Sequence, residues 1–408
     1  IRNFVEESLT DSDLRKIIKN SYKDFSRKEI VPLRKIDNNN WLLELFHGPT
    51  LAFKDIALQF LGNLFNYYLD QNSNKLNIIG ATSGDTGSAA IEAVKGNKNI
   101  NIFILHPVNR VSNFQRRQMT TVKSKNVFNI GIKGTFDDCQ FIVKKLFKDK
   151  NSKNIKFGSI NSINWTRIMA QITYYIYAYL KLSTVYKKKK ISFSVPTGNF
   201  GDAYAGYIAK NKFNIPINKI IVATNENDIL DRFFRSGTYY KNNVKETNSP
   251  SMDIQVASNF ERLLYDLKKQ DSNEISNLMK KFEVKSSLFI DKNKNKNIMN
   301  EFLSYSISQK KTLQTIKDVY KKYNIILDPH TAVGYASSLK YLKGKNRDKV
   351  ITLATAHPAK FADEVFKAIK KKPILPTRYE NIFQLEENYK VLDNNYKIIK
   401  NYILNNSV

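Results

Sequence analysis

The chain has 408 residues, of which 42% are hydrophobic and one, Cys139, is a cysteine. This length allows two or three globular domains. The single cysteine excludes an intramolecular disulfide and any multi-cysteine metal site. We expect Cys139 to be a core residue of a helix. The net charge of +29 comes from lysines spread along the whole chain, which favours a solvated surface over a nucleic-acid-binding patch. No run approaches the ~20 apolar residues that span a bilayer, and no secretory pattern begins the chain, so we expect a cytoplasmic protein.

The first half of the chain alternates between strand-like and helix-like segments. Short helical patterns precede a strand at Trp41–Phe46. Thr50 can cap the helix that follows, which places Lys54 in about its first turn. Further strands are predicted at 76–80, 100–105 and 127–132, and further helices at 88–94, 114–121, 138–147 and 165–182. This alternation predicts an α/β architecture with mainly parallel sheets.

The second half continues the pattern with one interruption. Residues 236–300 are more polar and less periodic, so we expect an insertion or a flexible face there. Around this stretch, strands are predicted at 191–195, 220–224 and 349–354, and helices at 316–323 and from about His330. We expect an N-terminal remnant with the first strand over residues 1–50, a smaller α/β domain over 51–185 and a larger one over 186–408.

The first motif with chemical content is His47-Gly48-Pro49-Thr50-Leu51-Ala52-Phe53-Lys54-Asp55. The positive end of a helix and the apolar neighbours Ala52 and Phe53 both disfavour the ammonium form of Lys54. A free amine is what imine chemistry requires. Taken alone, a lysine early in a helix is more often solvent-exposed, so this motif needs support from others.

Two loops that follow strands are suited to anions. Thr82-Ser83-Gly84-Asp85-Thr86 combines hydroxyls with backbone N–H groups at a helix start, which suits a carboxylate or a phosphate. Gly198-Asn199-Phe200-Gly201 leaves room for a phosphate to approach the backbone. The second loop matches neither a Walker loop nor the dinucleotide spacing, which favours a cofactor with a single phosphate.

Two further segments carry candidate binding residues. Asn161-Ser162-Ile163-Asn164-Trp165-Thr166-Arg167 gathers polar groups at a helix start, where Arg167 could bind a phosphate or a carboxylate through two hydrogen bonds. Thr355 and Lys360 follow the strand at 349–354, and ligands of α/β sheets bind at the carboxyl ends of strands. His47, His330 and His357 lack acidic or cysteine partners at ligand spacing, so no metal site is predicted.

Taken together, these segments closely resemble the threonine synthases, pyridoxal-phosphate enzymes of the tryptophan-synthase-β fold type (fold type II). The resemblance runs from about Trp41 to Val365, with gaps after residue 236. It implies two α/β domains with helix-flanked, mainly parallel sheets and pyridoxal 5'-phosphate in the cleft between them. Members of this family usually carry a longer segment before the first strand, so we expect this chain to lack part of it.

The resemblance also implies residue roles. Lys54 would be the Schiff-base lysine and proton shuttle, and the loop Gly198, Asn199, Phe200 and Gly201 would hold the cofactor phosphate. Thr355 would hydrogen-bond the pyridine nitrogen and leave it unprotonated. The residues Thr82, Ser83, Gly84, Asp85 and Thr86 would border the ring and receive the substrate carboxylate, although relatives often have asparagine where Asp85 stands. Arg167, with Asn161 and Ser162 and assisted by Lys360, would bind the substrate phosphate.

The implied reaction converts O-phospho-L-homoserine and water to L-threonine and phosphate in threonine biosynthesis, as a lyase acting on a phosphate ester. The protein is then expected to bind a small-molecule substrate and to bind no nucleic acid, membrane or metal. It is expected to be a monomer or homodimer. Alternatives on the same fold are a phospho-lyase that releases a 2-oxo acid and a threonine or serine dehydratase. A relative that binds the cofactor without turnover and a basic nucleic-acid-binding protein are more remote alternatives.

Overall fold

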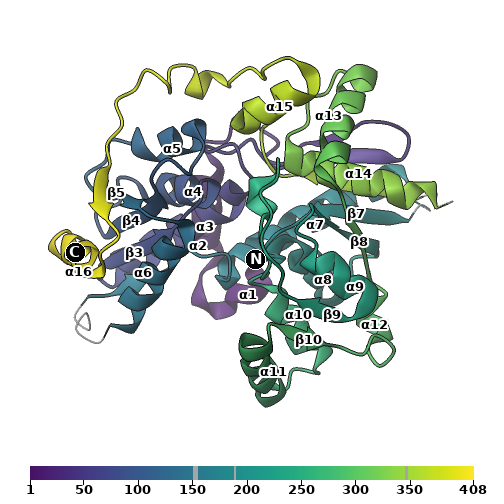
Figure 1. Ribbon diagram of the computed structural model, residues 1–408, viewed down its shortest axis with the longest axis horizontal. Helices are drawn as coiled ribbons and strands as arrows, with labels where there is room; N and C mark the ends of the chain where they lie inside the picture. The colour runs from purple at the N-terminus through teal and green to yellow at the C-terminus, as the bar shows by residue number, and fades with distance from the viewer. Residues whose placement is uncertain (150–154, 188–189, 345–347) are drawn as a thin grey trace. The chain divides into compact units, whose positions relative to one another are not determined.

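The computed structural model describes residues 1–149, 155–187, 190–344 and 348–408 (Figure 1). These residues form two compact units, each made of separated segments. Unit 1 contains Ile1–Ile30, His47–Thr166 and Ile374–Val408, and unit 2 contains Val31–Phe46 and Arg167–Pro373. The predicted domains were consecutive segments instead, and their boundaries stay a prediction. Among the described residues, no helix combines the length and apolarity that a bilayer crossing needs.

Unit 1 is built on a parallel sheet with the strand order β13-β5-β4-β3-β6. Its strands are β3 (Leu76–Ala81), β4 (Ile100–Pro107), β5 (Val127–Lys133), β6 (Phe157–Gly158) and β13 (Lys390–Asp393). Its helices are α1 (Arg2–Val5), α2 (Asp11–Tyr22), α3 (Lys54–Gln71), α4 (Asp85–Val94), α5 (Asn113–Thr120), α6 (Phe136–Lys148) and α16 (Tyr396–Asn405). The alternation of strands and helices predicted for residues 76–147 is therefore confirmed.

Helices cover both faces of this sheet because successive strand residues point to opposite sides. Ile78 of β3 packs in one core with residues of α3 and α4, such as Leu58 and Ala89. Its neighbour Ile79 packs in a second core with α6 and α16. Cys139 of α6 is fully buried in that second core, which confirms the prediction that it is a helix core residue.

Unit 2 is built on a six-stranded sheet with the order β1-β2-β12-β7-β8-β11, in which only β1 and β2 pair antiparallel. The strands are β1 (Leu33–Lys35), β2 (Asn40–Glu44), β7 (Ile191–Pro196), β8 (Ile217–Thr224), β11 (Phe302–Ser306) and β12 (Lys349–Ala354). Its helices are α7 (Trp165–Val185, which begins in unit 1), α8 (Gly201–Lys212), α9 (Ile229–Ser236), α10 (Phe260–Leu267), α11 (Ser272–Lys285), α12 (Lys296–Met299), α13 (Gln309–Tyr323), α14 (Pro329–Lys343) and α15 (Ala362–Ile369).

Both faces of this sheet are covered as well. On β7, the Ser194 hydroxyl donates to the Gly334 carbonyl of α14 (2.7 Å). The adjacent Phe193 side chain packs against Tyr175 of α7. All residues of β7 and β12 are buried, as expected for strands covered on both faces.

The polar stretch 236–300 is ordered into elements of unit 2. It forms α10, α11, α12 and a two-stranded antiparallel sheet of β9 (Thr238–Tyr240) and β10 (Ser287–Phe289). Phe260 of α10 and Phe282 of α11 are both buried; Phe260 stacks on Tyr239, and Phe282 packs against the same ring at a tilt. The stretch expected as an insertion or a flexible face thus forms regular elements, because a few aromatic anchors hold a segment whose average composition is polar.

The C-terminal segment completes unit 1 (Figure 1). Its strand β13 pairs in parallel with β5, a strand that the sequence analysis did not predict. Before β13, Glu387 accepts hydrogen bonds from the guanidinium of Arg116 (2.8 Å) and the hydroxyl of Thr120 (2.7 Å). These hydrogen bonds, those from Arg116 above all, lower the pKa of the Glu387 carboxyl to about 2. The segment is thus attached through α5 as well as through the sheet.

His106, at the carboxyl end of β4, is buried beneath this segment beside Tyr389. Within the described part of the chain, neither of its ring nitrogens has a hydrogen-bond partner. Burial, together with the charge of Arg116, lowers the pKa of the imidazole from 6.5 to about 4. Below pH 6.5 the unfolded chain therefore binds a proton that the folded chain excludes, and stability is lost as the pH falls from about 6.5 towards 4.

Replacing His106 by phenylalanine should remove this pH dependence. Between pH 7 and pH 5 the wild-type free energy of unfolding should fall by roughly 2 kcal/mol more than that of His106→Phe. Urea unfolding at the two pH values measures the change in the free energy of unfolding for each protein. His106→Leu is a second apolar variant with a smaller side chain, so it shows whether the larger ring of phenylalanine has a steric effect of its own. Equal losses in the wild type and both variants would contradict the assignment.

Candidate active site

Asp55 organises the loop that presents Lys54. Its buried carboxylate accepts hydrogen bonds from the Thr50 backbone N–H (2.7 Å) and the Thr50 hydroxyl (2.6 Å). A Cβ atom at Gly48 would lie 2.4 Å from the Asp55 Cβ, so this position requires glycine. The helix begins at Lys54 and its N-cap residue is Phe53. The predicted capping role of Thr50 was therefore wrong, since its side chain closes the loop instead.

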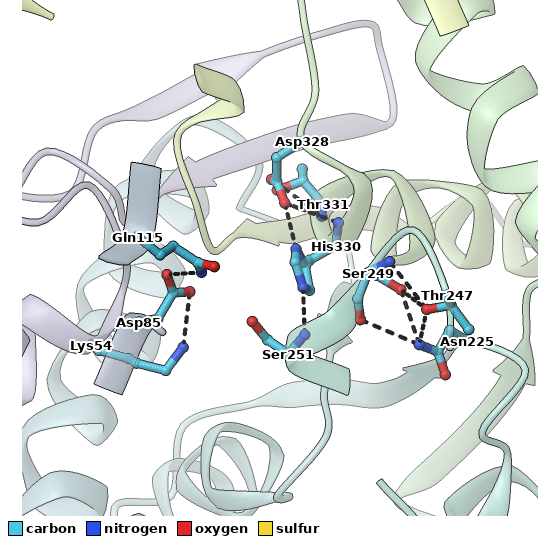
Figure 2. Close-up of polar contacts among 10 residues, drawn as sticks. All are labelled: Lys54, Asp85, Gln115, Asn225, Thr247, Ser249, Ser251, Asp328, His330 and Thr331. Carbon is cyan, nitrogen blue, oxygen red and sulfur yellow. Dashed lines mark hydrogen bonds and ion pairs between the residues drawn. The ribbon is translucent and has the colours of Figure 1, made fainter. Parts of the chain in front are cut away.

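The Lys54 amine lies against an acid from the next helix. Its Nζ atom is 3.3 Å from a carboxylate oxygen of Asp85, and the two side chains are 12% and 5% exposed. Figure 2 shows the side chains of Lys54 and Gln115 converging on this carboxylate. The structure thus brings together two predicted site residues and adds Gln115, which the sequence analysis missed although Ser112-x-x-Gln115 is a capping-box pattern.

The loop between β3 and α4 is held by Thr82. The Thr82 hydroxyl oxygen accepts hydrogen bonds from the backbone N–H groups of Gly84 (3.0 Å) and Gly87 (2.9 Å). Gly84 has a φ of 146°, a conformation that favours glycine, and α4 has no side-chain cap at its N-terminus. Ser83 is exposed and Thr86 is half-buried. Thr82 therefore shapes the loop and also accepts the Gly87 N–H in the first turn of α4.

In unit 2, the second predicted anion loop joins β7 to α8. Phe200 is fully buried at a φ of 66° and packs against Phe234, Phe260 and Phe302. A left-handed conformation is unfavourable for a bulky residue, so this aromatic cluster has to stabilise it. The Thr197 hydroxyl hydrogen-bonds Asp202, whose carboxylate also accepts from the Ala203 N–H (2.8 Å). The loop is thus fixed on both sides of Gly198–Gly201.

The supposedly flexible stretch contacts this loop. A Cβ atom at Gly198 would lie 2.9 Å from the backbone oxygen of Ser251. The Ser251 N–H donates to His330 Nε2 (3.1 Å), and His330 Nδ1 lies 2.9 Å from Asp328, the N-cap of α14 (Figure 2). Because Nε2 accepts, Nδ1 carries the proton and donates to the carboxylate. His330 is therefore a structural residue that holds the segment packed on the phosphate loop.

A hydrogen-bond network anchors the same segment to the end of β8. The Asn225 side-chain amide donates to the Thr247 hydroxyl (2.8 Å), the Ser249 hydroxyl (3.0 Å) and the Asp253 carboxylate (2.7 Å). Burial raises the pKa of the Asp253 carboxyl. Sequence spacing gave no sign of this network, whose members come from two separate segments.

Thr355 is placed by the order of strands in unit 2. It is buried and directly follows β12, which pairs in parallel with β7. The carboxyl ends of neighbouring parallel strands meet at one edge of a sheet. Thr355 and the loop Gly198–Gly201 therefore lie at the same edge, and a ligand shared by them stays a prediction.

The predicted substrate-phosphate residues have different surroundings. Asn161 is exposed in a turn, in which its carbonyl accepts from the Asn164 N–H (3.1 Å), and Ser162 is half-buried. Arg167 is buried in α7, and burial lowers the pKa of its guanidinium to about 10. Lys360 is buried in a short turn after Thr355. A shared role for these residues stays a prediction.

Comparison with known proteins identifies the family. Residues 28–293 match the model of the pyridoxal-phosphate dependent enzymes, and residues 331–403 match the model of the threonine synthase C-terminal region. A threonine synthase of Pseudomonas aeruginosa is 45% identical over 99% of this chain and 86% of its own length. The chain belongs to the threonine synthase family.

Solved threonine synthases agree in structure as well. The pyridoxal-phosphate-bound threonine synthase of Brucella melitensis superposes with a TM-score of 0.95 at 42% identity, covering 100% of this chain and 87% of that one. The yeast threonine synthase superposes with a TM-score of 0.92 at 41% identity, covering 98% and 86%. The fold is therefore that of a fold type II pyridoxal-phosphate enzyme, and the predicted fold class, family and cofactor are confirmed.

The residues of this member of the threonine synthase family suit pyridoxal phosphate. A largely buried amine stands at Lys54, and the uncapped N-terminus of the 12-residue helix α8 follows the loop Gly198–Gly201. Buried amines form imines readily once deprotonated, and uncapped helix starts bind phosphate. The buried hydroxyl residue Thr355 at the same sheet edge as this loop is consistent with contact to a heteroaromatic ring nitrogen.

Proposed function

We propose that this chain converts O-phospho-L-homoserine and water to L-threonine and phosphate. The observation that carries the proposal is the buried Lys54–Asp85 pair at the N-termini of α3 and α4. It provides a buried amine with an acidic neighbour, which can hold the cofactor and then exchange protons with the substrate. This chain belongs to the threonine synthase family, whose reaction needs such an amine.

The residue roles follow from this placement. Lys54 would attach the cofactor and then move protons at the α and β carbons of the substrate as a free amine. The loop Gly198, Asn199, Phe200 and Gly201 would hold the cofactor phosphate, and Thr355 would face the pyridine nitrogen. Pyridoxal phosphate, when bound, supplies the electron sink that stabilises negative charge at the α carbon.

The remaining site residues would bind the substrate. The hydroxyl and backbone N–H groups of Thr82, Ser83, Gly84 and Thr86 would receive its carboxylate, while Asp85 would border the cofactor ring beside Lys54. Arg167, together with Asn161, Ser162 and Lys360, would stabilise the phosphate that leaves from the γ carbon. Excess basic charge on the chain would favour approach of this anionic substrate.

We also propose that the protein acts in the cytoplasm as a monomer or homodimer. The single cysteine of the chain supports a reducing compartment. Size-exclusion chromatography with light scattering would distinguish the two assembly states.

The experiment that tests the function is addition of O-phospho-L-homoserine to the purified protein loaded with pyridoxal phosphate. We expect threonine and phosphate in equal amounts, measured by chromatography and a phosphate assay. Release of phosphate with a 2-oxo acid in place of threonine would identify a phospho-lyase instead. Absence of both products from a protein with bound cofactor would overturn the assignment of substrate.

A further inference from the structure

A chain of polar contacts leads from the start of α5 to the Lys54 amine. The Ser112 hydroxyl donates to Gln115 Oε1 (2.8 Å), and Gln115 Nε2 donates to one carboxylate oxygen of Asp85 (2.7 Å). The other oxygen of Asp85 is 3.3 Å from Lys54 Nζ. The carboxylate is thus shared between an amide on one side and an amine on the other (Figure 2).

The orientation of the Gln115 amide is fixed by its two neighbours. An ionised carboxylate only accepts hydrogen bonds, so the amide nitrogen has to face Asp85. The amide oxygen then accepts from the Ser112 hydroxyl. Ser112 is also the N-cap of α5 and accepts from the Gln115 N–H (3.3 Å). The cap that starts the helix therefore also sets the direction of the Gln115 side chain.

The fold makes room for this contact. Asp85 and Gln115 lie in the first turns of α4 and α5, the helices that follow β3 and β4. Because these strands are parallel neighbours, both helix starts lie at the same sheet edge. Gln115 is 4% exposed and Asp85 is 6% exposed. A Cβ atom at Gly84 would lie 2.7–2.8 Å from three atoms of the Gln115 amide. Glycine at 84 is needed for this approach as well as for its φ.

We propose that Gln115, oriented by Ser112, is a positioning residue that holds the Asp85 carboxylate as the counter-ion of Lys54. This inference rests on the proposed function, because it assigns the device that prepares Lys54 for its role there. A charge-assisted hydrogen bond in a buried site favours the ionised carboxylate. It also keeps Asp85 in place when Lys54 gives up its positive charge on reacting.

The first test measures the Lys54 amine in the cofactor-free protein. Trace labelling with acetic anhydride, quantified at Lys54 by mass spectrometry across a pH series, reports the pH at which the amine becomes reactive. In Gln115→Leu the counter-ion is less well held, so the ammonium is less favoured and the labelling midpoint should fall by about 0.5–1 pH unit. A midpoint that is unchanged or higher would overturn the proposal.

The second test uses Ser112, where two variants separate capping from orientation. Ser112→Thr keeps both the cap and the hydroxyl and should behave as the wild type. Ser112→Gly keeps most of the capping preference but removes the hydroxyl that binds Gln115 Oε1. It should therefore shift the labelling midpoint in the same direction as Gln115→Leu. A wild-type midpoint in Ser112→Gly would contradict the orienting role.

In the loaded enzyme, Gln115→Leu should lower kcat/KM about 10–100-fold, the effect of losing one hydrogen bond to a charged group. The acid limb of its pH profile should move to higher pH, because Asp85 is then protonated more easily. Asn129→Leu is the matched control, since it removes another buried amide bonded to α5 (Asn129 Nδ2 to Met119 O, 3.0 Å). This control should lower stability but change neither kcat/KM nor the acid limb of the pH profile. If Asn129→Leu changed both as much as Gln115→Leu does, the effects of Gln115→Leu would be structural and the positioning role would be contradicted.

The two proposals fail separately. The labelling midpoint is measured without cofactor or substrate, so it does not depend on which substrate the enzyme uses. A shifted midpoint in a protein that makes no threonine would support the positioning role and overturn only the proposed substrate. Normal threonine formation with unshifted midpoints in both the Gln115 and Ser112 variants would overturn only the positioning role.

Discussion

Replacing Lys54 by alanine should abolish covalent cofactor attachment and lower turnover by about 10³-fold or more. The Lys54 amine lies 3.3 Å from Asp85 in a largely buried setting at the start of α3, and alanine offers no nucleophile there. The measurements are the absorbance of the lysine-bound cofactor and the rate of threonine formation. Retention of both would show that another residue holds the cofactor.

Two controls separate lost chemistry from lost structure. Lys54→Gln keeps an N–H donor towards Asp85, so it should fold as the wild type does and still lack both signals. Lys98→Ala changes an exposed lysine of the same unit and should leave both intact. Partial recovery of Lys54→Ala by an added small primary amine would confirm that the missing group is the amine itself.

Replacing Gly198 by valine should weaken pyridoxal-phosphate binding by about 10–100-fold. The first added carbon would lie 2.9 Å from the Ser251 backbone oxygen and 3.2 Å from the Met252 Cα. Both are main-chain atoms, so the clash cannot be relieved by rotating a side chain. The loop or the facing segment has to move, and the backbone N–H groups move with it. Titration of the cofactor-free protein with pyridoxal phosphate measures the change.

A second glycine serves as the control for Gly198. Gly80 is a buried residue of β3, and a Cβ atom there would meet only the end of the Ile104 side chain, at 3.4 Å. Gly80→Ala should therefore bind the cofactor normally. Binding by Gly198→Val that equals the wild type, in a folded protein, would contradict the placement of the phosphate loop.

The local order of the site could be predicted from the sequence. Lys54, the Thr82–Thr86 loop and the Gly198–Gly201 loop each stand where a strand or turn passes into a helix. Glycines, hydroxyl residues and the strand before them mark such places in the sequence. The motifs, taken together, also carried the resemblance to the threonine synthases, which the comparisons confirmed.

Contacts between distant segments could not be predicted in this way. Thr50 was expected to cap a helix, yet its hydroxyl binds Asp55, because the loop closes on a buried acid. The stretch 236–300 was expected to be an insertion or a flexible face, yet Ser251 packs on Gly198 and donates a hydrogen bond to His330. Average composition does not reveal whether such a segment forms regular structure, since a few aromatic and polar residues at the right positions suffice to order it.

The sequence by itself determined the α/β class, the reactive lysine candidate and the anion loops, because each depends on neighbours within a few residues. Only the tertiary structure decided that Gln115 meets Asp85 and that β13 joins the sheet beside β5. These pairings depend on which strands become neighbours. Sheet order is set by the packing of whole faces against helices, which no short window of sequence records.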